Sequence, residues 1–185
     1  MNTLFTNKRY NTPRHAHEIT FSCYQSRDYL LDDRLCEFFI ESLEESKRNY
    51  AFLIWAYVLM PTHIHLLIWP KNTEYDIAVI FKAIKGRCAR KYSTYLKDMS
   101  MHKWNEFLVP SRGRMDFRLW QSGGGFDRNL WNATAIHHSI TYIEGNPVRK
   151  KLVLRPEDWR WSSAHARMFN EGLMPDVFQV PVLMK

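Results

Sequence analysis

The amino-acid sequence predicts an α+β fold of the ferredoxin-like sandwich type, in which helices pack on one central antiparallel sheet. Two observations favour this class. Segments typical of strands and helices follow in the order strand, helix, strand, strand, helix, basic loop, helix. Residues 52–60 form a near-continuous apolar run, as expected of a strand that is covered on both faces. One sheet covered by helices is the arrangement that buries such elements.

The first half of the chain supplies three strands and one helix. Residues 17–25 mix β-forming residues with alternating polarity and predict the first strand. Residues 32–49 carry apolar side chains at helical spacing and begin with two aspartates, which are good N-caps. A proline–threonine break separates the two apolar runs at 52–60 and 63–69, which predict adjacent buried strands.

The second half supplies two further helices and a long connection. Residues 74–96 place apolar side chains along one helical stripe, and residues 132–145 predict a third helix that ends before an Asn-Pro pair. The connection at 97–131 is basic and glycine-containing, and we expect it to be irregular and functional. A turn at 155–158 precedes a short helix that begins after Ser163.

Composition limits the class of protein. The chain has 185 residues, of which 45% are hydrophobic, so it can bury a core and is not disordered. We expect a single domain over residues 1–185, with tails at 1–14 and 166–185. Three cysteines without a C-x-x-C pair fit the reducing cytoplasm, and no apolar signal segment opens the chain. Polar residues break the apolar run at 51–69, so we expect no membrane span.

The positive charge is concentrated in one part of the sequence. The net charge is +7, and residues 82–118 contain ten basic and three acidic residues, which gives the same excess. Aromatic residues are interleaved with these charges, a combination that suits single-stranded nucleic acid. A solvated helix face followed by a basic loop is an equally good interpretation. The candidate DNA contacts are Lys82, Lys85, Arg87, Arg90, Lys91, Arg112 and Arg114.

His63 and His65 form a second candidate site. On a strand, residues two apart face the same side and lie about 6.6 Å apart, so the two imidazoles can converge on one divalent cation. Two half-exposed histidines with a packing or capping role are the alternative. A third ligand has to come from elsewhere in the chain, because neither a C-x-x-C pair nor further alternating histidines are present.

The predicted helix at 132–145 carries the third candidate set. His138, Tyr142 and Asn146 follow at i, i+4 spacing, which places them on one helical face. The amide oxygen of Asn146 can bind a hard cation, and the phenol of Tyr142 can attack a phosphate held nearby. The alternative is that Tyr142 has a packing role and that Asn-Pro is an ordinary helix stop.

Several short blocks along residues 15–165 together resemble one family. Val58-Leu59-Met60-Pro61-Thr62-His63-Ile64-His65 resembles the HUH motif of single-tyrosine insertion-sequence transposases, where U is a bulky apolar residue. The later blocks are similar to those of the REP-associated tyrosine transposases, and they come in the same order. These blocks are Leu119-Trp120-Gln121, Asp127-Arg128, Tyr142-Ile143-x-x-Asn146-Pro147-Val148 and Pro156-Glu157-Asp158-Trp159-x-Trp161-Ser162-Ser163.

The resemblance implies an HUH endonuclease fold and a metal-dependent DNA transposase. His63 and His65 would bind the metal with Asn146 as third ligand, and Tyr142 would be the nucleophile. The ion would be Mg²⁺ or Mn²⁺, because one ligand is an amide and no thiolate is present. The partner would be hairpin or single-stranded DNA, cut through a 5′-phosphotyrosine link by a monomer or a homodimer.

Two other functions stay open at this stage. The first is a non-catalytic, transposase-derived protein that only binds nucleic acid. The second is a metal-dependent phosphoesterase that uses water as its nucleophile. His138, a neighbouring basic group or the cation could activate Tyr142, and the sequence does not choose among them.

Overall fold

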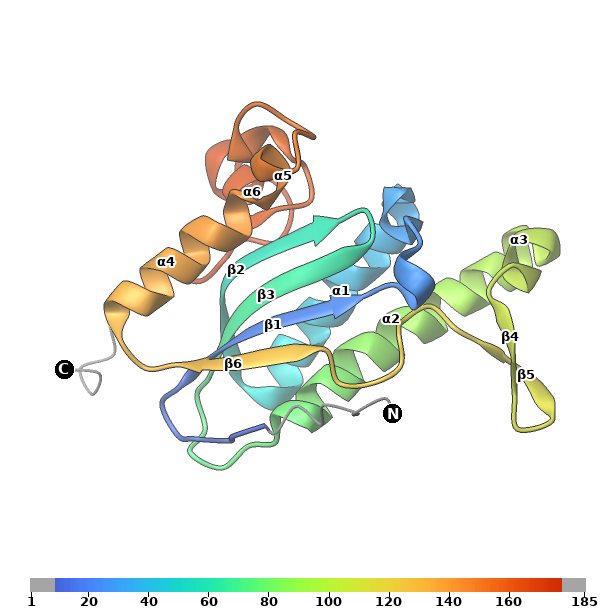
Figure 1. Ribbon diagram of the computed structural model, residues 1–185, viewed down its shortest axis with the longest axis horizontal. Coiled ribbons are helices and arrows are strands. Elements are labelled where there is room, and N and C mark those ends of the chain that lie inside the picture. Colours follow the sequence, from blue (N-terminus) through green and yellow to red (C-terminus); the bar gives the residue numbers. More distant parts are fainter. Residues whose placement is uncertain (1–8, 178–185) are drawn as a thin grey trace, which may run out of the picture.

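A computed structural model of the chain describes residues 9–177 and contains one four-stranded sheet (Figure 1). Its strands lie in the order β2-β3-β1-β6, and all neighbours are antiparallel. Because β3 lies between β1 and β2 and is antiparallel to both, β1 and β2 are parallel to each other, as in a split βαβ unit. In the same way, β3 and β6 are parallel to each other on either side of β1. The α+β class and the antiparallel sheet with helices on it are confirmed. The strands are β1 Ala16–Ser22, β2 Phe52–Met60, β3 His63–Pro70 and β6 Phe126–Leu130.

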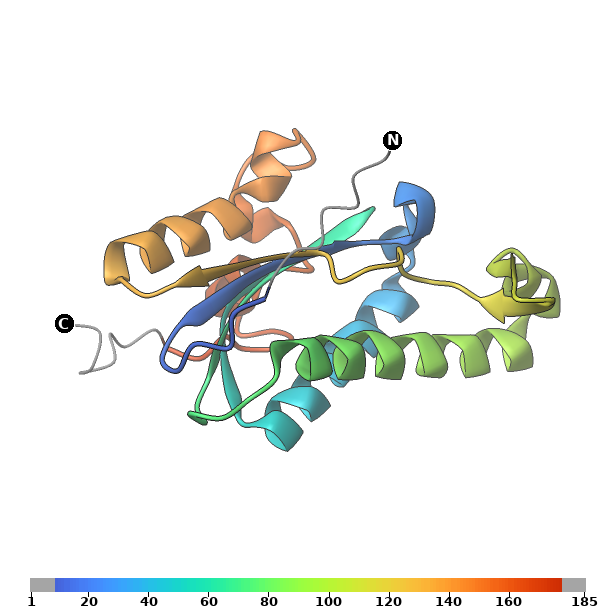
Figure 2. The same ribbon diagram turned by 60° about the horizontal axis from the view of Figure 1, so that its bottom comes forward.

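Helices cover both faces of this sheet. Figure 2 shows α1 (Asp33–Tyr50) and α2 (Ile77–Met99) below the sheet, with α4 (Ala133–Glu144) above it. The short helices α5 (Asn146–Arg149) and α6 (Ser163–Phe169) follow at the far end of α4. None of the helices in the described range is both long and apolar enough to cross a membrane.

Strand alternation divides the core into two layers. On β3, Ile64, Leu66 and Ile68 join the apolar cluster that contacts α1 and α2. Leu67 points to the other face and joins the cluster under α4. The predicted two-sided burial of residues 52–60 is therefore confirmed, because both clusters contain residues of β2. These residues alternate between the clusters except at Trp55 and Ala56, where an irregularity in the β2–β3 register places both under α4. The cluster under α4 contains Ala16, Trp55, Ala56, Val58, Met60, Leu67, Leu130, Ile136 and Ile143.

The connection between α2 and β6 is more regular than expected. It contains α3 (Met101–Asn105) and a hairpin of β4 (Leu108–Ser111) and β5 (Arg114–Phe117), which extends beyond the sheet in Figure 1. Arg112 and Gly113 form its two-residue turn with φ values of 48° and 80°. Positive φ at both central positions is the geometry that matches the twist of a hairpin, and glycine adopts it without strain.

The connection also contains a fourth strand of the main sheet, which the sequence pattern did not reveal. Residues 126–130 read FDRNL, with two charges and one amide among five residues, and this pattern does not predict a strand. They form β6 because β1 offers an unpaired edge. Gly125 leads into β6 with φ +70°, and a Cβ there would lie 2.3 Å from the carbonyl oxygen of Thr20. Only glycine fits so close to β1.

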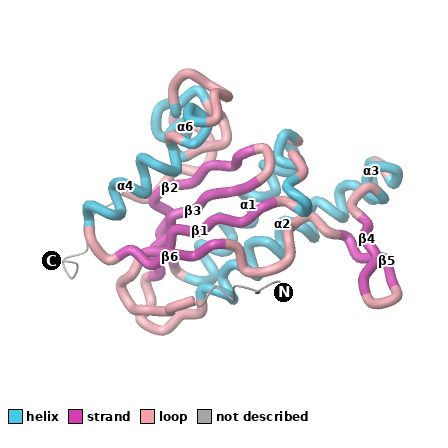
Figure 3. The backbone as a smooth tube through the Cα atoms, in the orientation of Figure 1, coloured by secondary structure: helices cyan, strands magenta, loops and turns pink. Residues whose placement is uncertain are grey.

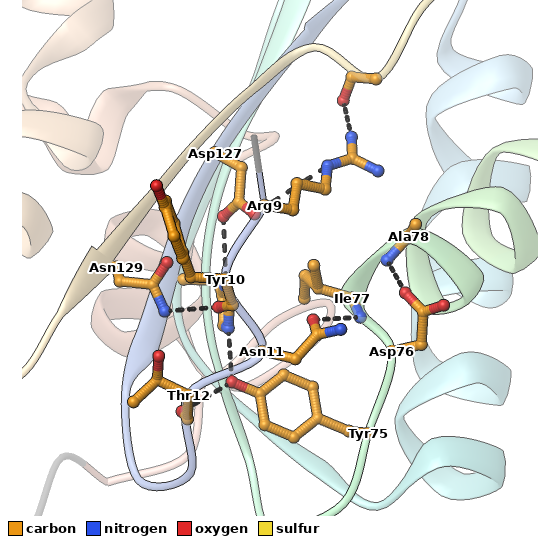
Figure 4. A network of polar contacts seen from close by, with 12 residues as sticks. Arg9, Tyr10, Asn11, Thr12, Tyr75, Asp76, Ile77, Ala78, Asp127 and Asn129 are labelled. Carbon is orange, nitrogen blue, oxygen red and sulfur yellow. Dashed lines mark hydrogen bonds and ion pairs between the residues drawn. The ribbon is translucent and has the colours of Figure 1, made fainter. Parts of the chain in front are cut away.

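A polar network joins the N-terminal segment to α2 and β6 (Figure 4). The Nδ1 and Nε2 atoms of buried His17 each lie 2.8 Å from a partner, the former from Asp127 Oδ1 and the latter from Tyr75 Oη. The Tyr75 hydroxyl donates to the Thr12 carbonyl. Because a carboxylate oxygen accepts, the Nδ1 atom of His17 donates to Asp127. The network therefore holds three distant segments of chain together.

Parts of the expected tails pack against the fold. Asn11 accepts a hydrogen bond from the Ile77 backbone at the start of α2. Residues 166–169 belong to α6. Asp176 accepts from Lys47 Nζ and from the Ile54 backbone at 2.7 and 2.8 Å. The outer parts of both expected tails, at 1–8 and 178–185, lie outside the described residues.

We predict that Asp127→Ala lowers the free energy of unfolding by about 3 kcal/mol, because it leaves the buried His17 donor without its acceptor. Urea unfolding followed by circular dichroism measures this change. The matched control is Asn129→Ala, on the same face of β6. The Asn129 side chain donates a hydrogen bond to the Tyr10 carbonyl. We expect the control to cost less than about 1 kcal/mol. Equal losses in the two variants would contradict the role given to the network.

Candidate active site

His63 and His65 lie at the start of β3, on the face covered by α4. The β2–β3 turn sets this position: its Thr62 carbonyl accepts from Cys23 N, and its Pro61 carbonyl accepts from Leu30 N. The two imidazole centroids are 4.9 Å apart, with the rings nearly perpendicular. The structure therefore brings the predicted pair together on one side of the sheet, as strand alternation requires.

A threonine hydroxyl orients each imidazole. Thr20 Oγ1 lies 2.8 Å from His65 Nδ1, and Thr62 Oγ1 lies 2.9 Å from His63 Nδ1. Thr20 reaches His65 because the two residues are partners across the β1–β3 ladder. With both Nδ1 atoms occupied, the Nε2 atom of each ring is left for another partner. A hydrogen-bonded Nδ1 is the usual way in which a metal-binding histidine is held in place.

Both histidines are neutral at pH 7. Burial lowers the pKa of His65 to about 4, and the positive charges that His63 and Arg149 can carry lower it further. Burial also lowers the pKa of His63, with a smaller contribution from Lys150. A neutral imidazole has the lone pair that a metal ion needs, so the pair is in the form that can bind one.

Tyr142 meets the histidine pair within the same chain. Its ring stands edge-on to His65, with centroids 5.9 Å apart and an interplanar angle of 89°. The Tyr142 side chain stays accessible, since 47% of the residue is exposed. The structure thus brings a residue from late in the chain to His65, whose ring lies next to that of His63.

Contacts at both ends fix α4 over the sheet. Ile136 and Ile143 are fully buried in the cluster below the helix. At the C-terminal end, buried Glu144 accepts a hydrogen bond from the Ser163 hydroxyl and pairs with Arg167 of α6. Tyr142 therefore projects from a rigid element, a condition for a precise site.

Asn146 is close to Tyr142 in the chain, and its side chain makes hydrogen bonds to the backbone that the sequence did not predict. It lies just beyond α4, and only 5% of it is exposed. Its Nδ2 donates to the carbonyls of Tyr142 and Ile143 at 3.1 and 3.4 Å. The amide nitrogen thus closes the end of α4, which leaves the amide oxygen as the atom that could bind a cation. Within the described residues, no three His, Cys, Asp or Glu side chains gather at one metal site.

Sequence analysis missed two cations next to the histidines. Arg149 lies over the Tyr142 ring, with its guanidinium carbon 4.2 Å from the ring centroid, and it also donates to the Tyr142 carbonyl. Lys150 acts on the pKa of His63. The run Arg149-Lys150-Lys151 directly after the Asn-Pro pair was the available signal. These charges make the site attractive to phosphate.

The candidate DNA contacts on α2 do not form one free basic stripe. Lys91 pairs with Glu41 and Glu45 of α1 at 2.8 and 2.7 Å, and Arg87 approaches Glu45 as well. Lys85 is half-buried, and its ammonium lies near the carbonyls of residues 121 and 123. Lys82 and Arg90 are exposed. α2 covers the sheet face opposite α4, and α1 carboxylates neutralise part of its charge, so contact of these residues with DNA stays a prediction.

Arg112 and Arg114 occupy the tip of the β4–β5 hairpin. Both are exposed, and Arg114 pairs with Asp116 at 2.7 Å. The β4–β5 hairpin that carries them projects beyond the four-stranded sheet (Figure 1 and Figure 3). Contact of these two residues with DNA stays a prediction.

The comparisons with known proteins agree with this geometry. The sequence profile of the family described as "Transposase IS200 like" matches residues 14–111, which include both histidines. The chain belongs to the IS200-like transposase family. A Haemophilus influenzae (strain Rd) protein named as a REP-associated tyrosine transposase is 25% identical over 141 residues, 76% of this chain and 74% of its own length. The resemblance noted in the sequence is confirmed.

Two solved structures are similar to this IS200-like transposase. A REP-associated tyrosine transposase bound to a REP hairpin has a TM-score of 0.66 and 19% identity, with 94% of this chain and 92% of the other covered. This likeness supports the fold. A transposase structure from Deinococcus radiodurans R1 has a TM-score of 0.46 and 18% identity, with 75% and 95% covered.

We predict that acid destabilises this transposase through His65. In the folded chain the pKa of His65 is about 4, whereas in the unfolded chain the pKa of a histidine is about 6.5. Stability is therefore full above pH 6.5 and falls as the pH decreases through that value. Between pH 7 and pH 5 the His65 contribution is about 2 kcal/mol.

Urea unfolding in EDTA at both pH values measures this loss. His65→Gln should remove most of it. His102→Gln, which replaces an exposed histidine of α3, should leave the loss as it is in the parent protein. An unchanged loss in His65→Gln would contradict the assignment.

Proposed function

We propose that this IS200-like transposase is a single HUH domain that cuts and rejoins single-stranded DNA next to hairpins through a 5′-phosphotyrosine intermediate. The observation that carries the proposal is the packing of accessible Tyr142 against His65, 5.9 Å between ring centroids, in one chain. A phenol held on a rigid helix beside two neutral imidazoles is suited to phosphate chemistry. The hairpin in the similar structure makes hairpin DNA the natural substrate to test.

The donor atoms fit a divalent cation. His63 and His65 would hold it through Nε2, because a threonine occupies each Nδ1. The Asn146 amide oxygen would complete the set, and with no thiolate among these residues Mg²⁺ or Mn²⁺ suits the site better than Zn²⁺. When bound, such a cation withdraws charge from a phosphate oxygen and makes phosphorus easier to attack.

In the proposed reaction, Tyr142 Oη forms a bond to phosphorus as the bond from phosphorus to the 3′-oxygen breaks. The phenol proton leaves and the departing 3′-oxygen gains one, so the products are a 5′-phosphotyrosine and a free 3′-OH. The covalent link keeps the phosphodiester energy, and a second 3′-OH can reverse the step without ATP. His138 lies one turn from Tyr142 in the same cavity and is a candidate proton carrier.

The cations beside the site would hold the DNA backbone. Arg149 and Lys150 are exposed next to Tyr142 and the histidines, and they would contact the phosphates around the scissile bond. Arg112 and Arg114 would reach the hairpin stem from the projecting β4–β5 arm. Among the candidate DNA contacts on α2, Lys82 and Arg90 are exposed and would remain available for a backbone remote from the site.

The two other functions predict different products. A protein that only binds nucleic acid would retain hairpin DNA without cutting it, with or without metal. A phosphoesterase that uses water would cut the strand without a protein–DNA adduct and would tolerate loss of Tyr142. The packing of Tyr142 on His65 favours the tyrosine mechanism, since water chemistry has no need for that phenol.

We predict that Tyr142→Phe abolishes the covalent adduct while DNA binding stays within about threefold of the parent protein. The change removes only the hydroxyl and keeps the ring that packs on His65. Labelled hairpin oligonucleotides with randomised single-stranded flanks are incubated with Mn²⁺ and resolved on a denaturing protein gel. The control is Tyr50→Phe at the end of α1, on the opposite face of the sheet, which should form the adduct normally. An adduct with Tyr142→Phe would exclude this nucleophile.

We also predict that Thr20→Val weakens Mn²⁺ binding by about 10- to 100-fold, because it removes the hydroxyl that orients His65 without changing side-chain size. Calorimetric titration with Mn²⁺ alone measures the affinity. Thr134→Val on the exposed side of α4 is the matched control and should bind as the parent protein does. Equal affinities in the two variants would show that the Thr20 hydroxyl does not position a metal ligand.

A further inference from the structure

A cavity of about 540 Å³ lies between α4 and the β1–β6 side of the sheet. His65 and Tyr142 line it on one side, so it adjoins the proposed cleavage site. Glu18, Phe126, Arg128 and Ser139 line it as well, and the tyrosine mechanism uses none of these four. Its volume is in the range of small-molecule pockets.

Glu18 is a buried carboxylate that can accept a further hydrogen bond. The residue is 5% exposed, and its Oε2 accepts from Arg128 Nη2 at 2.6 Å. Acidic side chains are rarely this buried unless a partner balances the charge, and Arg128 supplies that balance. Arg128 itself remains about half exposed. The second oxygen of Glu18 is left to accept another hydrogen bond in the cavity.

Ser139 presents a second polar group to the cavity. Its hydroxyl oxygen is buried and has no hydrogen-bond partner among the described residues. Serines inside helices commonly donate to the carbonyl four residues earlier, as Ser42 and Ser46 do in α1. Ser139 does not use that partner, and a buried hydroxyl without one is costly. The unused group indicates that a ligand completes it.

The strand register separates Glu18 from the metal ligands. Along the cavity face of β1, Ser22 pairs with His63, Thr20 with His65 and Glu18 with Leu67. Glu18 is therefore two residues along the strand from the level of His65 and four from that of His63, or roughly 7 and 13 Å. In the part of the chain that the structure describes, no three His, Cys, Asp or Glu side chains gather around one ion position. Glu18 thus lies beyond the proposed metal position, where a nucleotide next to the scissile phosphate would lie.

We propose that this cavity holds one unpaired nucleobase next to the cleaved bond and selects bases that carry an amino group over thymine. The proposal rests on the proposed function, which lays a single strand across Tyr142. Glu18 accepts a hydrogen bond from the exocyclic amino group, and Ser139 donates to the neighbouring ring nitrogen of cytosine or adenine. Thymine offers an oxygen where Glu18 needs a donor.

The other two side chains complete the pocket. Phe126 is 47% exposed at its rim and provides a ring on which a base can stack. Arg128 pairs with Glu18 and faces the strand with its remaining donors. Base selection thus comes from Glu18 and Ser139, whereas Phe126 and Arg128 support any base.

The test measures binding in EDTA, so it does not depend on cleavage. Fluorescence anisotropy compares a labelled dT12 strand with dT12 strands that carry one central dC or dA, at constant salt. We expect the single dC or dA to raise the affinity of the parent protein about five- to tenfold. Glu18→Gln and Ser139→Ala should each reduce that preference to less than twofold, whereas Phe126→Ala should weaken all three strands equally.

The matched control is Glu37→Gln, which removes another arginine-paired carboxylate on α1, on the opposite face of the sheet. It should keep the full preference. A parent protein without base preference overturns the proposal, and so does a preference that survives both Glu18→Gln and Ser139→Ala. If Glu18→Gln does not fold, Ser139→Ala and Phe126→Ala decide the outcome. Failure of the tyrosine mechanism shows separately, as a missing adduct with the parent protein.

Discussion

The structure depends on the period-two alternation of the sheet, combined with the covering of both of its faces. On β3 this alternation sends Ile64, Leu66 and Ile68 to the α1–α2 layer, and His63, His65 and Leu67 to the layer under α4. The imidazoles share their face with apolar residues that hold α4 in place. The same packing that buries Ile136 and Ile143 therefore brings Tyr142 to His65. A register slip of one residue would separate the nucleophile from the ligands and expose the core at once.

Neighbouring residues of β6 show the same division of roles. Asp127 points to the α2 side and holds His17, whereas Arg128 points to the α4 side and pairs with Glu18. The Asp-Arg block of the sequence thus combines one structural residue and one cavity residue. The short edge strand links them, because β1 fixes the register of both. A strand rich in charges at this edge also opposes unwanted pairing with other chains.

The sequence predicted the local elements better than the contacts between them. The apolar runs of β2 and β3 and the stripes of α1, α2 and α4 have periods that depend on nearby residues alone, and the structure contains these elements close to the expected bounds. β6 was missed because its strand conformation comes from pairing with β1, more than 100 residues earlier in the chain. The ion pairs of Lys91 on α2 could not be predicted because its partners Glu41 and Glu45 lie on another helix. Glu18 and Ser139 gave no local signal, since the tertiary fold alone brings them to the cavity beside Tyr142.

The choice of hydroxyl partners for the two histidines fits a site for a polyanion. A carboxylate behind each imidazole would orient it equally well and would raise its basicity, but it would also add negative charge. Thr20 and Thr62 orient the rings without adding charge. The pKa of His65 therefore stays low, and no carboxylate behind the rings offsets the positive charges of Arg149 and Lys150. The one buried carboxylate of the cavity, Glu18, is balanced by Arg128. The electrostatic result is a neutral pair of ligands in positive surroundings, which draws in phosphate and leaves both imidazoles free to bind a cation.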